Sequence, residues 1–259
     1  MESLNEIKRD TLKAYLLQGK RADNRGMYDY RPITLQPGIL QNAEGSSIAT
    51  IGRSQVMAGI KFDIATPFAD RPTEGVLSTS ADLLPLASHI FETGPPSDES
   101  IELARVVDRG IRSANTLDLN SFFITEGKVL AVYIDLFILD HDGNLIDCAA
   151  LAAMSALLSA RMPKIEDNKL IRTESTGKLP LKEKVVTCTF GKLGDRVFLD
   201  PAFDEERGMD ARLTLATTSQ HVCAGQKGGW GAFSEKEMNE LADISIQKGK
   251  DLRALLKDD

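Results

Sequence analysis

Apolar and polar positions along the chain follow a helical and then a strand-like spacing, and this order occurs more than once. Apolar residues three to four apart predict an amphipathic helix over residues 3–18, closed by Gly19. Short runs with apolar alternation come next and favour a meander of antiparallel strands. These runs cover residues 31–36, 45–52, 54–65 and 74–83.

The middle of the chain carries a polar-capped helix pattern and a long apolar run. Two prolines and a polar start predict a helix over residues 97–114. A strand is expected over residues 129–139 and a shorter one near Leu145. The Asp-Gly pair within residues 140–144 favours a hairpin between them.

Residues 148–160 are apolar or small on every side, which predicts a buried helix ended by Pro163. A second series of strands is expected after a polar stretch. The final helix begins with a capping box, Ser234 with Glu237 three residues later, and reaches about Leu256. The second strands cover residues 182–194, 195–200, 211–219 and 221–228, and the helix face carries Met238, Leu241, Ser245, Leu252 and Leu255.

Strands followed by helices, twice, predict an α+β protein with two halves. We expect an N-terminal helix and basic loop over residues 1–25 and a first half over residues 26–163. A joint over residues 164–184 then leads to a second half over residues 185–259. Within the basic loop, the cationic residues are Lys20, Arg21 and Arg25.

Composition narrows the class of protein. Of 259 residues, 42% are hydrophobic and 27% charged, which is typical of a globular chain without a membrane span. The charged N-terminus argues against a secretion signal, and three scattered cysteines argue against disulfides or a zinc cluster, so we expect a cytoplasmic protein. The net charge of −7 means that any nucleic-acid binding must depend on a local basic patch or on other chains.

One such patch is a line of arginines in the helix predicted over residues 97–114. Arg105, Arg109 and Arg112 are four and three residues apart, which puts them on one helical face. Arginine holds phosphate through two parallel hydrogen bonds, so the line suits an RNA backbone. A solvated face paired with Glu102 and Asp108 explains the same pattern. The opposite, buried face is expected to carry Ile101, Ala104, Val107 and Ile111.

Two acidic segments raise the question of a metal or acid–base site. The first is better explained as a solvated hairpin tip, because no metal-ligand spacing accompanies it. The second follows a strand and could hold magnesium or act in acid–base chemistry, but surface acids are the preferred explanation. The first segment comprises Asp135, Asp140, His141, Asp142 and Asp147. The second comprises Asp200, Asp204, Glu205, Glu206 and Asp210.

The glycine-rich segment over residues 225–231 lacks a phosphate-loop spacing. We expect it to let two backbones approach closely, with Trp230 as a packing anchor. The three histidines, His89, His141 and His221, are far apart and support no catalytic triad. We therefore expect no metal site and no cofactor.

Taken in order, several segments resemble the ribonuclease PH family from about residue 20 onward. They are RPITLQPGILQNAEGSSIATIGRSQVMAGI, ADLLPLAS, ELARVVDRGIRS, YIDLFILDHDGNLIDCAALAAMSALL, VFLDPAFDEERGMDARLTLATTS and QKGGWG. Within the family, LARVVDRGIR, DGNLIDCAALAA, LDP with its acidic run, and QKGG are most similar to the non-catalytic subunit of the archaeal exosome ring.

This resemblance implies the ribonuclease PH fold, related to domain 2 of ribosomal protein S5, with two similar βαβα halves. It also implies a ring of three heterodimers with a catalytic ribonuclease PH-type subunit, RNA-binding cap subunits and single-stranded RNA. Active members shorten RNA from its 3′ end with inorganic phosphate. In the family the arginine-bearing helix faces RNA, which favours Arg105, Arg109 and Arg112 as RNA-binding residues.

The catalytic pattern of the family is altered here. Where active members carry Gly, Thr and Arg after the Asp-Gly turn, this chain has Asn144, Leu145 and Ile146. Of two family aspartates, the first matches Asp200, whereas the second position holds Glu206. An isoleucine offers an anion neither charge nor hydrogen bond, so we expect no catalytic residues and no activity of the chain alone.

Two alternatives remain open at this level. The chain could be a divergent phosphate-dependent 3′-to-5′ exoribonuclease that uses Asp200 and Glu206, with magnesium. It could also be a protein-interaction module on a similar α+β scaffold, for which the arginines would have no effect on RNA affinity.

The loop that carries Asp23, Asn24 and Arg25 also departs from the Asp-Gly-Arg sequence that is common in the family.

Overall fold

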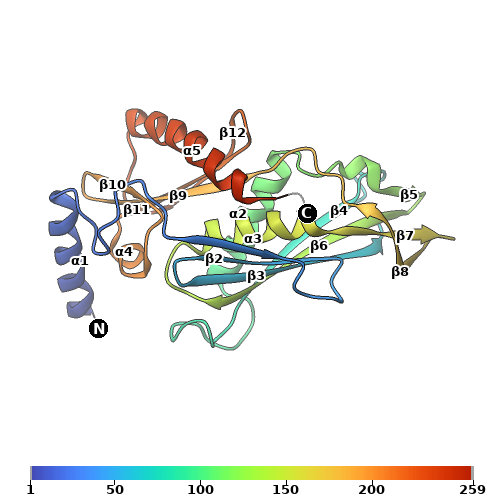
Figure 1. Cartoon of the computed structure of the whole chain (residues 1–259), viewed down its shortest axis with the longest axis horizontal. Coiled ribbons are helices and arrows are strands. Elements are labelled where there is room, and N and C mark those ends of the chain that lie inside the picture. Colours follow the sequence, from blue (N-terminus) through green and yellow to red (C-terminus); the bar gives the residue numbers. More distant parts are fainter. Residues whose placement is uncertain (1, 258–259) are drawn as a thin grey trace.

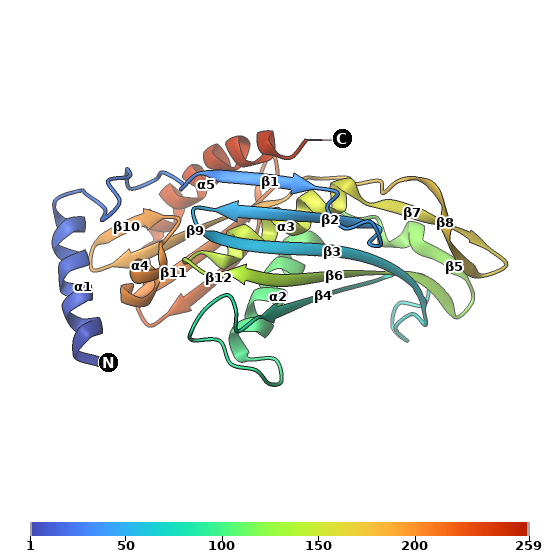
Figure 2. The same ribbon diagram turned by 60° about the horizontal axis from the view of Figure 1, so that its bottom comes forward.

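The computed structural model describes residues 2–257, and its first half is built on a large twisted sheet. The strand order is β1-β2-β3-β6-β4, with a short strand β5 also paired to β6 (Figure 2). The predicted antiparallel meander is confirmed for β1, β2 and β3. The strands are β1 (Ile33–Pro37), β2 (Gly45–Ile51), β3 (Ser54–Ala65), β4 (Val76–Leu83), β5 (Phe123–Thr125) and β6 (Lys128–Asp140).

Strand β4 departs from the meander, because it pairs with β6 and runs parallel to it. The connection between them contains helix α2 (Asp98–Ser113) and a 3-10 turn, η1 (Leu119–Phe122). Parallel neighbours require such a crossover, whereas a hairpin can join only antiparallel strands. Expecting β4 in the meander was therefore wrong, and the strand lies at the edge of the sheet.

The helices α2 and α3 (Leu145–Ser159) pack on this sheet. As predicted, α2 begins after Ser97, whose hydroxyl accepts a hydrogen bond from the Ser100 backbone N–H. The buried helix expected from residue 148 is confirmed, but it begins at Leu145, so the predicted hairpin and short strand are wrong. A Cβ on Gly45 would lie 2.5 Å from the Ala156 carbonyl oxygen, which shows how closely α3 approaches the sheet.

The second half repeats the pattern on a smaller sheet, with strand order β10-β9-β11-β12 and antiparallel pairing throughout. Its elements are β9 (Val186–Leu193), β10 (Arg196–Leu199), α4 (Phe203–Gly208), β11 (Ala211–Thr217), β12 (Val222–Gly229) and α5 (Glu235–Leu255). In each half a group of strands is followed by a helix, a second group of strands and a second helix, so the expected βαβα arrangement is confirmed for groups of strands.

Helix α5 confirms the predicted capping box, since the Ser234 hydroxyl accepts from the Glu237 backbone N–H. Along the predicted apolar face, Leu241, Ser245 and Leu252 are buried, whereas Met238 and Leu255 are about 40% exposed. The glycines before the helix do permit close approach: a Cβ on Gly229 would lie 2.6 Å from the Asp210 carbonyl oxygen. Trp230 is 77% exposed, so its prediction as a packing anchor was wrong.

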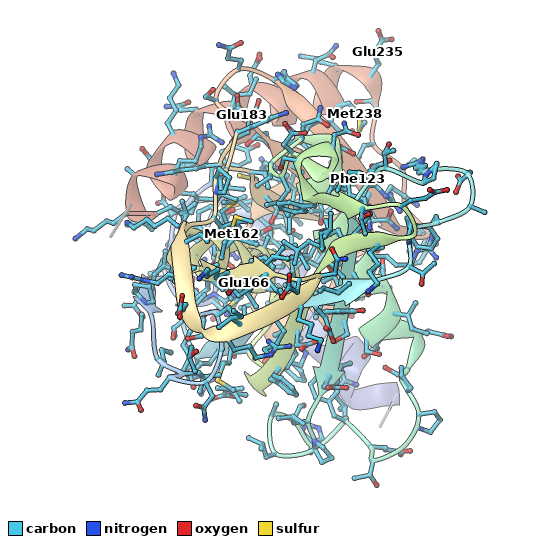
Figure 3. All side chains as sticks on the ribbon, turned by 90° about the vertical axis from the view of Figure 1, so that its right-hand side faces the viewer. Phe123, Met162, Glu166, Glu183, Glu235 and Met238 are labelled. Atoms are coloured by element: carbon cyan, nitrogen blue, oxygen red, sulfur yellow. The ribbon has the colours of Figure 1, made fainter. Side chains whose placement is uncertain are left out.

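Between the halves, a hairpin of β7 (Arg161–Glu166) and β8 (Lys169–Lys178) begins three residues before the predicted joint and occupies much of it. Figure 3 shows Met162 and Glu166 on this hairpin, at the end of the molecule where Phe123 also lies. Pro163 lies within β7 and does not end α3, whose last residue is Ser159.

The two sheets enclose α2 and α3, because α3 contacts β2, β3 and β9 while α2 contacts β4 and β12 (Figure 1). Helix α5 covers the outer face of the second sheet, and α1 (Glu2–Leu17) lies at one end against α4. Buried apolar side chains from both halves form one continuous cluster. Within the described residues, no helix has both the length and the apolar character needed to cross a membrane.

Candidate functional site

The first acidic segment of the sequence includes the turn from β6 into α3. This turn packs against the rest of the protein, so its interpretation as a solvated hairpin tip was wrong. The His141 ring stacks on Phe91 with 5.3 Å between centroids, and burial lowers the pKa of His141. Asp147, at the first turn of α3, is fully buried. Tertiary contacts thus order this turn.

Asp200, the aspartate that matches the family pattern, lies at the end of β10 with no exposed surface. Its Oδ1 accepts from Arg31 Nη2 and Asn144 Nδ2, each at 2.8 Å. Its Oδ2 accepts from Arg25 Nη1 at 2.7 Å and from Arg31 N and Nε, each at 2.9 Å. Burial acts to raise the pKa of Asp200, but the hydrogen bonds and charge of Arg31 outweigh it and hold the pKa below its ordinary value. Asp200 is therefore an ionised, internally paired carboxylate.

The backbone carries a special conformation at this site. Asp200 has φ 52° and Asn144 has φ 53°, both in the left-handed region that few residues with a side chain adopt. Asn144 precedes α3, and its side chain joins Asp200 to Asp147 Oδ2, which accepts at 2.9 Å. The residue that stands at the family's glycine position thus serves as a hydrogen-bonded link between two buried carboxylates.

Glu206, which takes the place of the family's second aspartate, reaches the amino-terminal end of α3. Its Oε2 accepts from the Asn144 backbone N–H at 3.3 Å, and its Oε1 lies 3.9 Å from Arg212 Nη1. Burial raises the pKa of Glu206, although Arg212 and the Asn144 N–H act in the opposite direction. A carboxylate of the chain itself therefore lies where the amino-terminal end of a helix attracts anions.

A cavity of about 500 Å³ lies beside these groups. Leu145 and Ile146, which replace the threonine and arginine expected of an active member, form part of its wall. The Arg212 side chain donates to Glu102 Oε1 at 2.7 Å and is only 16% exposed. The remaining lining is mostly apolar or aromatic: Leu83, Ile90, Phe91, Leu103, His141, Phe203 and Met209, with Glu99 and Arg207.

The arginine line on α2 is exposed, as predicted. Arg109 Nη1 donates to Gln226 Oε1 on β12 at 2.9 Å, and Arg112 Nε donates to Asp108 Oδ2 at 2.6 Å. Within residues 2–257, Arg105 has no hydrogen-bonding or ionic partner. The structure thus leaves these guanidinium groups at the surface, and their role with RNA stays a prediction.

The buried face of α2 matches expectation at Ala104, Val107 and Ile111, but Ile101 is 47% exposed and was predicted wrongly. Glu102, considered as a partner of the arginine line, pairs with Arg212 of β11 instead. Asp108 does pair within the line.

The sequence missed the partners of the second acidic segment. Glu205, treated as a surface acid, is buried and forms an ion pair with Arg21 of the basic loop. Arg25 and Arg31 hold Asp200 in the same way. The only signal in the sequence was that a basic segment and an acidic segment were both present, which does not specify that they meet.

Comparisons with known proteins agree with this architecture. Residues 29–163 match the first domain of the 3′ exoribonuclease, or ribonuclease PH, family, and residues 184–248 match its second domain. The chain therefore belongs to this family of two-domain α+β proteins.

Among curated relatives, "Exosome complex component Rrp42" of Thermococcus gammatolerans is 42% identical over 99% of this chain and 96% of that protein. The protein of that name from Methanothermobacter thermautotrophicus is 40% identical over 96% of this chain and 93% of its own length. A solved chain described as "archaeoglobus fulgidus exosome with RNA bound to the active site" superimposes with a TM-score of 0.92 at 40% identity, covering 98% of this chain and 99% of that one.

Proposed function

We propose that this chain is a ring subunit of an archaeal exosome that contributes to RNA binding in 3′-to-5′ RNA degradation and does not itself perform the reaction. The names of the full-length relatives support membership of the complex. In this complex the chain would pair with a catalytic ribonuclease PH-type subunit, and three such heterodimers would form the ring. The further partners would be RNA-binding cap subunits and single-stranded RNA. We place the complex in the cytoplasm, and the three free cysteines fit a reducing compartment.

The observation that carries the proposal of inactivity is the state of Asp200. Both of its carboxylate oxygens accept hydrogen bonds from Arg25, Arg31 and Asn144, and the side chain has no exposed surface. A general base or a magnesium ligand needs a lone pair that faces substrate or metal. This carboxylate is instead committed to holding the chain together.

The anion site argues in the same direction. Phosphorolysis requires a phosphate ion held in line with the scissile bond. Here Glu206 takes the amino-terminal end of α3, and Leu145 and Ile146 provide apolar surface beside it. A phosphate dianion would meet a carboxylate and two aliphatic side chains, while the nearby Arg212 is already paired with Glu102 and Glu206. Losing a positioned charged donor typically costs about 2–4 kcal/mol of transition-state stabilisation, or a hundred- to a thousand-fold in rate.

The test measures phosphate-dependent shortening of a labelled single-stranded RNA. We expect none from the purified chain, and activity after the catalytic ribonuclease PH-type subunit is added, with native mass reporting assembly. The catalytic subunit alone is the matched control. Shortening by this chain alone would contradict the proposal and favour the alternative exoribonuclease that uses Asp200 and Glu206.

A further inference from the structure

The loop between β4 and α2, residues 84–97, extends away from the body of the molecule (Figures 1 and 2). With the end of β4 and the start of α2 it walls a groove of about 640 Å³, called here the acidic groove. Strand β4 is an edge strand, so no further strand of this sheet covers that side. The groove is therefore open to a partner.

Four carboxylates line the acidic groove: Asp82, Glu92, Asp98 and Glu99. Asp98 and Glu99 lie in the first turn of α2, where negative charge stabilises a helix. Asp82 and Glu92 lie outside the helix and do not stabilise it in this way, and both are exposed. Among the residues that the structure describes, no lysine, arginine or histidine lines this groove, and none of the four acids has an ionic partner.

Apolar side chains accompany the acids. Leu83, Leu84, Ile90 and Phe91 line the groove, and Leu86 in the same loop is 74% exposed. Apolar side chains flanked by exposed charged ones resemble the apolar centre and polar rim of a protein–protein interface. Leu83, Ile90, Phe91 and Glu99 also line the cavity beside Ile146 and Glu206, so the groove and the cavity are neighbours that share one wall.

We propose that the acidic groove binds a segment of a partner protein in which lysine or arginine side chains flank apolar ones. Complementary charge selects this occupant, because four carboxylates repel the phosphates of RNA and attract a basic segment. The apolar lining supplies the contact area that a charge pair at an exposed surface does not. The inference rests on the proposed function only in expecting the partner among the other subunits of the same complex.

A crosslinking experiment identifies the occupant. The photoreactive residue p-benzoylphenylalanine replaces Leu86 in a complex reconstituted from this chain, the catalytic subunit, the cap subunits and a short RNA. A matched site is Phe123, which is 45% exposed at the end of the molecule seen in Figure 3. We expect crosslinks from position 86, and not from position 123, to a segment of another subunit that bears lysine or arginine. Crosslinks to RNA, to a second copy of this chain or to an uncharged segment would overturn the inference, as would none.

A second measurement uses the isolated full-length chain and a labelled peptide in which lysine alternates with leucine. Reversing both unexplained acids, Asp82→Lys with Glu92→Lys, should weaken binding about ten-fold, because two attractions become repulsions. The matched control, Glu126→Lys with Glu166→Lys, reverses two exposed acids elsewhere and should leave the affinity unchanged.

A peptide with glutamate in place of lysine should not bind. Equal losses in both double variants, or binding of the glutamate peptide, would refute the charge argument. If the wild-type chain fails to enter the reconstituted complex, native mass shows that the proposed function is wrong, and the peptide measurement alone then decides the groove.

Discussion

Asp200 lies where the family places a catalytic carboxylate, and three residues distant in the sequence surround it. Arg31 alone donates from its backbone N–H and from two guanidinium nitrogens, while Arg25 and Asn144 supply the rest. Two cations and a neutral amide around a buried anion form a satisfied network. Breaking such a network by removing the anion leaves buried charge without compensation.

The variant Asp200→Asn should therefore lose stability, by about 3–5 kcal/mol, since Arg31 and Arg25 would face an amide instead of a carboxylate. Urea denaturation monitored by circular dichroism measures the change in the free energy of unfolding. Glu126→Gln, an exposed acid, should behave as the wild type. A variant of unchanged stability whose reconstituted complex degraded RNA more slowly would instead indicate a catalytic Asp200.

At the scale of elements, α2 presents one face to the core and another to solvent, and the exposed face carries the arginine line. Arg105 is the cleanest probe, because it has no partner within residues 2–257, whereas Arg112 also holds Asp108 and the Leu77 carbonyl oxygen. A substitution of Arg112 would thus change the stability of the protein as well as its affinity for RNA.

If the arginine line binds RNA, Arg105→Ala and Arg109→Ala should each weaken affinity and reduce the slope of log affinity against log salt by about 1 per lost phosphate contact. Fluorescence anisotropy with labelled single-stranded RNA, titrated in the reconstituted complex at several salt concentrations, gives both quantities. Lys250→Ala, exposed on α5, is the control. An unchanged slope in both arginine variants would favour a protein-interaction role for this face.

Helix α5 contains a glycine at position 249, within its length, where propensity alone favours alanine by about 1 kcal/mol. A Cβ there would lie 2.7 Å from Thr217 Oγ1 and 3.0 Å from Arg253 Nη2. Arg253 donates to the Thr217 carbonyl oxygen at 3.0 Å, so both neighbours are held in place.

Gly249→Ala should consequently lower stability, by about 1 kcal/mol after the gain in helix propensity, because overpacking a tight contact costs about 1–3 kcal/mol. Thermal and urea denaturation report the difference. Lys250→Ala, one residue further and exposed, should change little. A stabilised Gly249→Ala variant would show that the contact between α5 and β11 yields easily.

At the scale of the whole molecule, the two βαβα halves share their interior. Asp147 of α3 accepts hydrogen bonds from the hydroxyls of Thr187 and Thr189, each at 2.8 Å, and both lie on β9 of the other half. Tyr30 donates to the same carboxylate at 2.9 Å. Burial raises the pKa of Asp147 despite these bonds. A buried polar cluster inside one apolar core couples the halves.

We therefore expect the halves to unfold together in one transition. Hydrogen exchange of the β9 and β11 amides reports on the second half, and that of the β3 and β6 amides reports on the first. Both should give the same midpoint in urea if one core is lost at once. Two separated midpoints would show that the apolar cluster does not couple the halves.

The sequence determined what local physics controls. The period of apolar residues predicted most helices and strands. The capping box at Ser234 and the close backbone approach of the glycine-rich segment 225–231 were also predicted from the local sequence alone. The altered residues Asn144, Leu145 and Ile146 were also visible in the sequence, because the motif around them is contiguous.

Only the tertiary structure decided which distant segments meet. Arg31 and Asp200 are 169 residues apart, and nothing in either segment specifies the pairing that turns a candidate catalytic acid into a buried ion pair. The parallel pairing of β4 with β6, the helix that begins at Leu145 and the groove walled by residues 84–97 arise in the same way. Each depends on long-range packing, and spacing along a chain carries no information about packing between elements that are far apart in it.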